Sequence, residues 1–314
     1  MEDIRIPVGA WADVAFDWLK DNLAWLFDFI TLVVRFLVDT LTEVLVDLHP
    51  LVIILILAFF GLLVRSWQFA VGTLITLFFI MTMDQWVSAM QTLALVVLAA
   101  LVAIIIAIPV GILAARNDTV SAIVKPILDF MQTMPAFVYL IPAVTFFSIG
   151  VVPGLVSTVI FALPPGVRFT ELGIRGVDSE TVEAGYAFGA TPRQILRGVQ
   201  LPLATPTIMA GINQVIMLAL AMAVIAGIVG ADGLGKNVVE AVATQNLRLG
   251  IEAGLGVVIL AIYLDRVTAA LGSAKDYPNS LLGMLKRRRN TSAENRQIAQ
   301  PREVDVVEID RVQS

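Results

Sequence analysis

Seven long apolar runs most constrain what this chain can fold into. They cover residues 48–64, 67–83, 86–115, 124–149, 152–170, 203–229 and 254–271. The hydrocarbon core of a bilayer is about 30 Å thick, so a helix that crosses it needs roughly 20 mostly apolar residues. The chain is 58% hydrophobic and 15% charged, whereas a soluble domain carries about 25% charged residues. We therefore predict an all-α integral membrane protein with about seven transmembrane helices.

The residue inventory excludes several kinds of chemistry. The chain has no cysteine and one histidine, His49. Disulfides, thiolate metal sites and histidine clusters are therefore excluded, and we predict no metal site and no enzyme activity in this chain. The first residues are acidic and lack a basic segment followed by an apolar stretch, so no cleavable signal peptide is expected.

Residues 1–47 form a region of a different kind. Arg35, Asp39, Glu43 and Asp47 recur at intervals of four, which places them on one helical face. Aromatic side chains can fill another face: Trp11, Trp18, Trp25 and Phe29. A helix with a charged face and aromatic anchors typically lies in the membrane interface. We predict an amphipathic interfacial helix here; a poorly hydrophobic span remains the alternative.

Lysine and arginine positions predict the orientation of the chain. Residues 1–47 hold three basic residues against nine acidic ones. Because basic residues favour the cytoplasmic side, this end is expected outside the cell membrane. Seven spans then place the C-terminus inside, where "KRRR" occurs at 286–289. The polar residues 273–314 have too little apolar content for a core and predict a disordered cytoplasmic tail.

The segment "EAGYAFGATPRQILRGVQLP" at 183–202 interrupts the apolar pattern with polar residues, glycines and prolines. Asp178 or Ser179 can cap a first short helix. Gly189 suits the left-handed residue after its end. Thr191–Pro192 has the pattern of an N-cap followed by proline and predicts a second short helix, which we expect to end at Pro202.

The first of these short helices has a face with almost no side chain. Its residues are Ala184, Gly185 and Ala187, followed by Gly189. Such a face permits close approach of another helix or of a groove in a partner. Two functions remain open, bracing of the protein's own bundle and docking of a soluble protein. A DNA-binding helix-turn-helix is disfavoured because basic residues are few and apolar spans flank the segment on both sides.

The same residues carry a resemblance to a known family. Glu183-Ala184-Gly185, Gly189 and Val199-x-Leu201-Pro202 resemble the EAA motif of ABC importer permeases, with matching spacing throughout. Gly185 stands for the third alanine of the motif and Val199 for its isoleucine. The resemblance implies that this loop contains a coupling helix that sits in a groove of a cytoplasmic ATPase. The coupling residues it implies are Glu183, Ala184, Gly185, Gly189, Leu201 and Pro202.

Longer strings narrow the resemblance. "LDFMQTMPAFVYLIP" (128–142), "IFALPPGVRFT" (160–170), "QLPLATPTIMAGINQVIMLALAMAVIA" (200–226) and "VVILAIYLDRVTAALG" (257–272) are similar to the glycine betaine/proline betaine branch. The resemblance covers about residues 86–272 and implies a type I ABC importer permease fold. It also implies import of glycine betaine, proline betaine, choline or a related methylated amine, as in that branch.

The resemblance further implies partners. ATP and Mg²⁺ would be bound by a separate ATPase subunit, and substrate would be delivered by an extracytoplasmic binding protein. A single EAA segment in a family that uses two permease halves implies a homodimer, with a different permease partner left open. The near match "GADGLGKN" at 230–237 to a phosphate-binding loop fails at Asn237, which replaces the hydroxyl that should hold Mg²⁺. Its glycines are expected to serve a tight turn and close packing.

Polar and aromatic residues inside the apolar runs suggest a transport path. Gln132 and Thr133 lie beside Pro135, and Asn213 and Gln214 lie within the run at 203–229. A polar residue buried in a bilayer usually faces the interior of the bundle. Interhelical hydrogen bonding is the alternative role.

A quaternary ammonium cannot donate a hydrogen bond, so aromatic faces are its natural partners. Phe137 and Tyr139 are the candidates, although aromatic residues in a span are more often belt or core.

An ATP-independent secondary carrier or channel is the rival class. Such proteins often place acidic residues inside the membrane for ion coupling. Nearly all the acids of residues 86–229 fall in or near connections between spans; Asp129 is the exception. An intramembrane enzyme is disfavoured because the sequence has no catalytic pairing of the required residue types.

Overall fold

The computed structural model describes residues 7–272, and in that part of the chain every regular element is a helix. The elements are α1 (Val8–Asp47), α2 (Pro50–Val64), α3 (Trp67–Thr82), α4 (Trp86–Arg116), α5 (Asp118–Thr133), η1 (Ala136–Tyr139), α6 (Leu140–Phe147), α7 (Val151–Arg175), α8 (Ser179–Ala187), α9 (Pro192–Ile195), η2 (Leu196–Gln200), α10 (Leu201–Ala226), η3 (Gly227–Val229), α11 (Leu234–Ala243) and α12 (Leu247–Gly272). The tail predicted at 273–314 lies outside the described residues.

The predicted number of about seven spans is reached when two bent helix pairs and the shorter apolar helix α3 are counted with the four long helices. In the described part of the chain, four helices are long and apolar enough to cross a membrane: α4, α7, the continuous helix Pro192–Val229, and α12. Two bent pairs raise the number to six if each pair is one span. The runs at 48–64 and 67–83 form α2 and α3, of 15 and 16 residues. At 1.5 Å per residue these helices are about 23 Å long, shorter than the hydrocarbon core.

The prediction of one continuous span at 124–149 is wrong. α5 ends at Thr133, and the helix formed by η1 and α6 starts at Ala136 in a direction that differs by 109°. Pro135 lies at the break. Met134 before it is extended, with ψ of 132°, because a proline disfavours helical geometry in the preceding residue. The break places Tyr139 of η1 against Phe161 of α7 and Met222 of α10.

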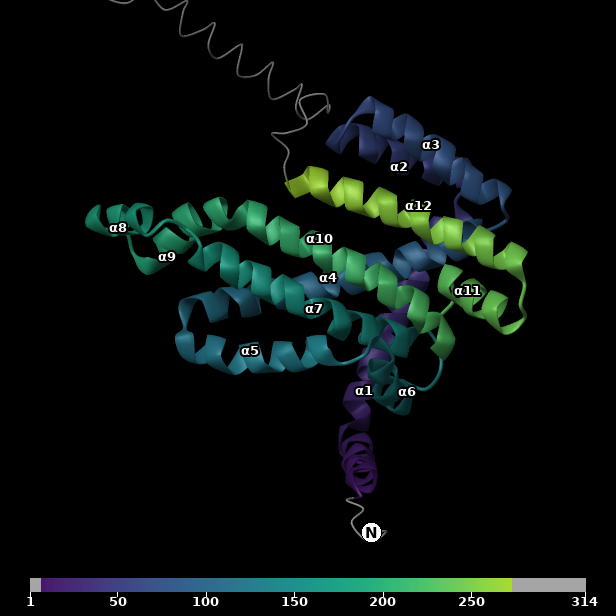
Figure 1. Ribbon diagram of the computed structural model, residues 1–314, viewed down its shortest axis with the longest axis horizontal. Helices are drawn as coiled ribbons and strands as arrows, with labels where there is room; N and C mark the ends of the chain where they lie inside the picture. Colours follow the sequence, from purple (N-terminus) through teal and green to yellow (C-terminus); the bar gives the residue numbers. More distant parts are fainter. Residues whose placement is uncertain (1–6, 273–314) are drawn as a thin grey trace, which may run out of the picture.

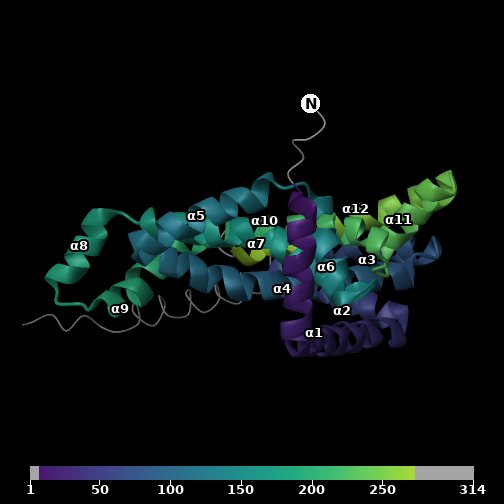
Figure 2. The same cartoon turned by 90° about the horizontal axis from the view of Figure 1, so that it is seen from below.

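The centre of the molecule is formed by α4, α7 and α10, which lie side by side along its long axis (Figures 1 and 2). Small residues let their backbones approach closely. A Cβ on Gly166 of α7 would lie 2.7 Å from the Cβ of Ala107 on α4. A Cβ on Gly111 of α4 would lie 2.5 Å from the Cβ of Thr170. The contact between these helices therefore depends on the absence of side chains.

α1 lies across α4, α7 and α10 in both views (Figures 1 and 2). It is 40 residues long, with non-helical dihedral angles at Leu23. One face packs on the bundle through Val34 and Val38. The opposite face is an exposed apolar stripe made of Trp11, Trp18, Trp25, Phe29, Leu32 and Phe36. This arrangement agrees with the helix expected at residues 10–47; its place in the membrane interface remains a prediction.

Candidate coupling loop and transport path

The loop predicted at 178–202 projects from one end of the long helices, opposite α11 (Figure 1). Asp178 caps α8, and its carboxylate accepts a hydrogen bond from the backbone N–H of Glu180 at 2.9 Å. Gly189 is left-handed, with φ of +78°. Thr191 and Gln194 form a reciprocal capping box at the start of α9. The helices and the turn between them are therefore as predicted.

The end predicted at Pro202 is wrong. The chain stays helical from Pro192 to Val229 and passes through the five-residue π-helix η2 before α10. The backbone N–H of Leu201 donates to the carbonyl of Leu196, five residues back. Proline and π-turns bend helices without ending them. The loop is therefore joined to α10 by an uninterrupted helix, and a displacement of α9 reaches α10 through the backbone.

The small-residue face of α8 packs against α9 through Gly185. A Cβ on Gly185 would lie 2.4 Å from Cδ1 of Ile195, so glycine lets α8 lie directly on α9. Glu183 and Ala184 are exposed. Two aromatic residues that were not among the predicted coupling residues, Tyr186 and Phe188, are also exposed; Phe188 is 93% exposed. The signal was present, because a phenylalanine before a helix-ending glycine in a short polar helix has no core to enter.

The polar path candidates at the end of α5 are not enclosed by this chain. Gln132 and Thr133 are exposed, and the hydroxyl of Thr133 donates to the carbonyl of Phe130 in its own helix. Phe137 of η1 is also exposed. These side chains are available to whatever covers α5 and η1, and their role in transport stays a prediction.

Tyr139 lies differently from its neighbours on η1. It is buried, its hydroxyl donates to the carbonyl of Met131, and its ring meets Phe161 of α7 edge to face at 5.9 Å. Ser157 of α7 donates to the carbonyl of Tyr139 at 3.2 Å. Tyr139 therefore anchors the break between α5 and α6 onto α7.

Asn213 and Gln214 are separate from the η1 group. Nδ2 of Asn213 donates to Oδ1 of Asp265 on α12 at 3.0 Å, which is an interhelical hydrogen bond. Gln214 is exposed. Tyr139 packs with Met222 of α10, and nine residues of helix place Met222 about 14 Å from Asn213 along the axis. The structure therefore does not bring all six path candidates together.

Charged contacts join α5 to α7, and the sequence analysis did not find them. Glu171 of α7 is buried, with 5% of its side chain exposed. Its Oε1 accepts from Ser121 Oγ at 2.7 Å and lies 3.3 Å from Lys125 Nζ; both partners are on α5. Arg175 Nε lies 3.0 Å from the same oxygen. One carboxylate oxygen therefore holds three partners on two helices.

Two further ion pairs lie on either side of Glu171. Arg175 contacts Asp118 at the start of α5 at 2.8 Å, and it also donates to the carbonyl of Ala114 on α4 at 2.8 Å. Asp129 of α5 pairs with Arg168 of α7. Asp129, the acid considered for ion coupling in a secondary carrier, therefore has a cationic partner on α7. Its ion pair is one of a row of contacts along α5 and α7.

The segment at 230–237 is a packing element. Gly233, with φ of +127°, starts α11, and a Cβ on Gly235 would lie 2.6 Å from the carbonyl oxygen of Val224. The amide of Asn237 donates to Gln85 at 2.7 Å and Ser88 at 3.0 Å. Lys236 lies 2.8 Å from Asp232, whose hydrogen bond raises the pKa of the lysine. In a phosphate-binding loop the residues at the positions of Lys236 and Asn237 would face the nucleotide and its Mg²⁺, whereas here both bind other side chains of the protein.

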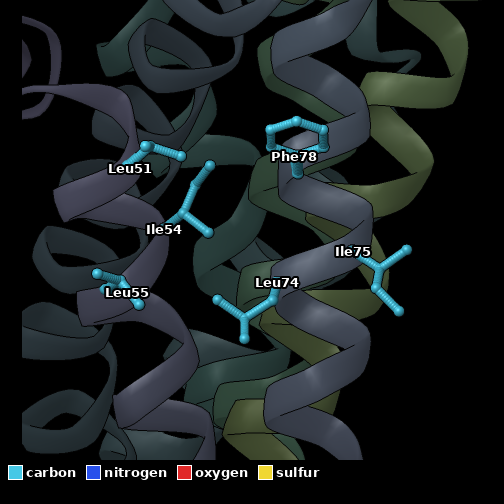
Figure 3. A pocket seen from close by; sticks show the side chains of 6 residues that line it. All are labelled: Leu51, Ile54, Leu55, Leu74, Ile75 and Phe78. Carbon is cyan, nitrogen blue, oxygen red and sulfur yellow. The ribbon is translucent and has the colours of Figure 1, made fainter.

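A groove of about 470 Å³ lies between α2 and α3. Figure 3 shows its lining, which is entirely apolar: Leu51, Ile54, Leu55, Leu74, Ile75 and Phe78. A zwitterionic or cationic solute needs polar or aromatic partners. The groove offers one aromatic ring and no polar group, so it matches hydrocarbon and not a betaine.

Comparisons with known proteins agree with this architecture. The family described as "Binding-protein-dependent transport system inner membrane component" matches residues 107–275. The inward-facing MetNI methionine ABC transporter has a chain of similar fold, with a TM-score of 0.55 and 25% identity, over 58% of this chain and 92% of that one.

Curated relatives cover more of the chain. The glycine betaine/carnitine transport permease protein GbuB of Listeria monocytogenes is 48% identical, over 84% of this chain and 95% of its own length. OpuAB of Bacillus subtilis, a glycine betaine transport system permease protein, is 47% identical over 84% of this chain and 94% of its own. ProW of Escherichia coli, named for glycine betaine and proline betaine, is 44% identical over 85% of this chain and 75% of its own.

Proposed function

Because the chain belongs to the binding-protein-dependent transport system inner membrane components, we propose that it imports glycine betaine, proline betaine, choline or a related methylated amine. The chain is a multi-pass permease of a bacterial inner membrane. Its relatives GbuB, OpuAB and ProW are named for glycine betaine, with carnitine or proline betaine in two cases. Identity of 44–48% over most of the chain supports a substrate of the same chemical class.

One observation carries the proposed coupling role. The α8–α9 loop stands at one end of α4, α7 and α10, and continues through η2 into α10 without a break. Phe188, at its tip, is 93% exposed. An apolar ring exposed on a polar, well-capped loop favours insertion into a partner groove. Glu183, Ala184, Gly185, Gly189, Leu201 and Pro202 would shape or face that contact.

The partner is a cytoplasmic ATPase that binds ATP and Mg²⁺. The loop then lies in the cytosol, the N-terminus lies outside and the C-terminus inside, as the basic residues predict. Substrate would come from an extracytoplasmic binding protein at the α11 end. Exposed Gln132, Thr133 and Phe137 support a second copy of this chain that completes the path, and the homodimer is tested by the mass of the purified complex.

The coupling role is tested with a matched pair of substitutions at Gly189. Gly189→Val places a β-branched side chain at φ of +78°, whereas Gly189→Asn tolerates the left-handed region. We expect substrate-stimulated ATP hydrolysis by the reconstituted complex to be lost with valine and largely kept with asparagine. Equal stimulated hydrolysis in the valine variant and the native chain would contradict the coupling role.

The substrate class is tested by uptake into proteoliposomes that contain the permease, its ATPase and its binding protein. Uptake of labelled glycine betaine should require ATP and should be reduced by proline betaine, choline or carnitine according to their affinity. Uptake that persists without the ATPase would support the secondary-carrier alternative. The ion pair between Asp129 and Arg168 argues against that alternative, because it gives Asp129, the acid singled out for ion coupling, a cationic partner within the protein.

A further inference from the structure

We propose that Glu171 is a positioning residue that makes α5 follow α7 when the coupling loop moves. The inference rests on the proposed function, because it extends the path of force from α8 to the helix that carries Gln132 and Thr133. Glu171, Ser121 and Lys125 lie outside the coupling motif and outside the predicted transport path.

Chain connectivity separates α5 from the coupling loop. α8 follows α7 directly, and α9 continues into α10, so both of these helices are joined to the loop by backbone. α5 lies between α4 and η1 and has no such connection. Along the backbone the loop reaches α5 from α7 only through α6, η1 and the break at Pro135. Direct transmission from α7 to α5 therefore depends on noncovalent contacts.

Apolar packing gives α5 little attachment. Of its side chains only Ser121 and Leu128 are buried, and Leu128 packs with Ala107 and Val167. A cavity of about 290 Å³ lies at this junction, lined by Lys125, Arg168, Phe169, Glu171, Leu172 and Arg175. Apolar contact alone therefore leaves much of the α5 face unattached, and charged side chains make the remaining connections.

Glu171 is the central member of these connections. Asp118 and Asp129 are exposed, so water screens their ion pairs. The Glu171 carboxylate is 5% exposed and meets Ser121 and Lys125 of α5. A buried carboxylate loses its hydration and is retained only with close partners. The same oxygen binds Arg175, one turn further towards α8 on α7. Glu171 thus joins α5 to the loop-proximal turn of α7.

Loss of the Glu171 contacts would affect transport differently if they only stabilise the fold than if they transmit motion from α7 to α5. Loss of a structural contact lowers stability and assembly, and leaves the ratio of substrate transported to ATP hydrolysed unchanged in the complexes that do assemble. Loss of a transmitting contact lowers this ratio, because the ATPase and loop still move while α5 does not follow. The ratio is therefore the readout that separates the two roles.

The test uses the complete complex of permease, ATPase and binding protein in proteoliposomes. Glu171→Gln keeps the shape of the side chain and removes its charge. Glu252→Gln is the matched control, because Glu252 also pairs with an arginine four residues away, Arg248, but within α12. We expect Glu171→Gln to hydrolyse ATP under stimulation while transport per ATP falls about fivefold or more, as expected for an allosteric coupling of ordinary size.

A second variant covers the case in which Glu171→Gln does not assemble. Ser121→Ala with Lys125→Gln leaves Glu171 and Arg175 paired and removes the contacts of Glu171 with α5, while Arg175 keeps its exposed pair with Asp118. It should lower the ratio to a similar extent. If both variants assemble, a native ratio of transport to ATP hydrolysis in both would overturn the inference. If Glu171→Gln does not assemble, a native ratio in the double variant alone would overturn it. Failure of the proposed function is distinguishable, because it would appear as native stimulated hydrolysis in Gly189→Val.

Discussion

Two regions of this molecule are held together by different physics. α4, α7 and α10 meet where side chains are absent, as at Gly111 and Gly166, so each backbone limits the movement of the next. α5 meets α7 through Glu171 and two flanking ion pairs, with Leu128 as its one buried apolar side chain. Close backbone packing fixes the relative positions of α4, α7 and α10. A few charged side chains join α5 to α7, and single substitutions can remove these contacts.

The largest loss of stability is expected from adding a side chain where α4, α7 and α10 pack closely. Gly166→Val should destabilise the protein by roughly 3 kcal/mol, because its Cβ would lie 2.7 Å from Ala107 Cβ and 3.1 Å from Val215. The free energy of unfolding, measured by titration with SDS, checks this. Gly254→Val is the control, since apart from the local backbone of its own helix no atom lies within 4 Å of a Cβ at that position. Equal stability of the two variants would show that close packing does not hold α4, α7 and α10.

A smaller effect is expected from the apolar attachment of α5. Leu128→Ala should cost about 2 kcal/mol, at the low end for a buried leucine because few other side chains of α5 are buried around it. The neighbouring Ile127, which is 54% exposed, provides the control as Ile127→Ala. SDS titration of both variants gives the comparison. A loss of unfolding free energy in Leu128→Ala as large as in Gly166→Val would mean that α5 is packed as firmly as α4, α7 and α10 are against one another.

Next in size is the substitution Arg175→Lys. The guanidinium contacts Glu171, Asp118 and the carbonyl of Ala114 at once, and a lysine ammonium cannot reproduce this forked geometry. A loss of about 1.5 kcal/mol is expected from weakened charged hydrogen bonds. Stability equal to the native chain would indicate that charge alone, without the geometry of the fork, joins the ends of α4, α5 and α7.

The smallest effect is expected from Asp129→Asn. The carboxylate of Asp129 is 64% exposed, so its pair with Arg168 should contribute less than about 1 kcal/mol. Uptake with ATP should stay near native. A loss of uptake that follows the pH of the medium would instead restore Asp129 as an ion-coupling group.

Features set by neighbours in the sequence could be predicted from it. The cap at Asp178, the left-handed Gly189 and the capping box of Thr191 depend on residues within one turn, and the structure has all three. The break at Pro135 and the continuation of the helix through Pro202 could not be predicted in this way. Both depend on how proline is accommodated by the rest of the fold.

Prolines in this chain illustrate the limit. Pro164 and Pro165 are buried inside α7, which continues through them, whereas exposed Pro135 lies at a 109° break. Packing against α4 and α10 supports the helix in the first case, and the local sequence does not contain that information. The charged contacts of α5 were missed for a similar reason, because Ser121 and Glu171 are 50 residues apart in the chain.

The most direct test measures distances between spin labels, and the absence of cysteine from the sequence makes site-specific labelling simple. One pair, at Ile123 and Leu172, spans α5 and α7; a second, at Leu172 and Leu203, spans α7 and α10. All three positions are exposed. In the native complex both distances should stay the same with and without trapped ATP. In Glu171→Gln only the first should broaden or shift, and an unchanged distance between Ile123 and Leu172 in that variant would contradict the account.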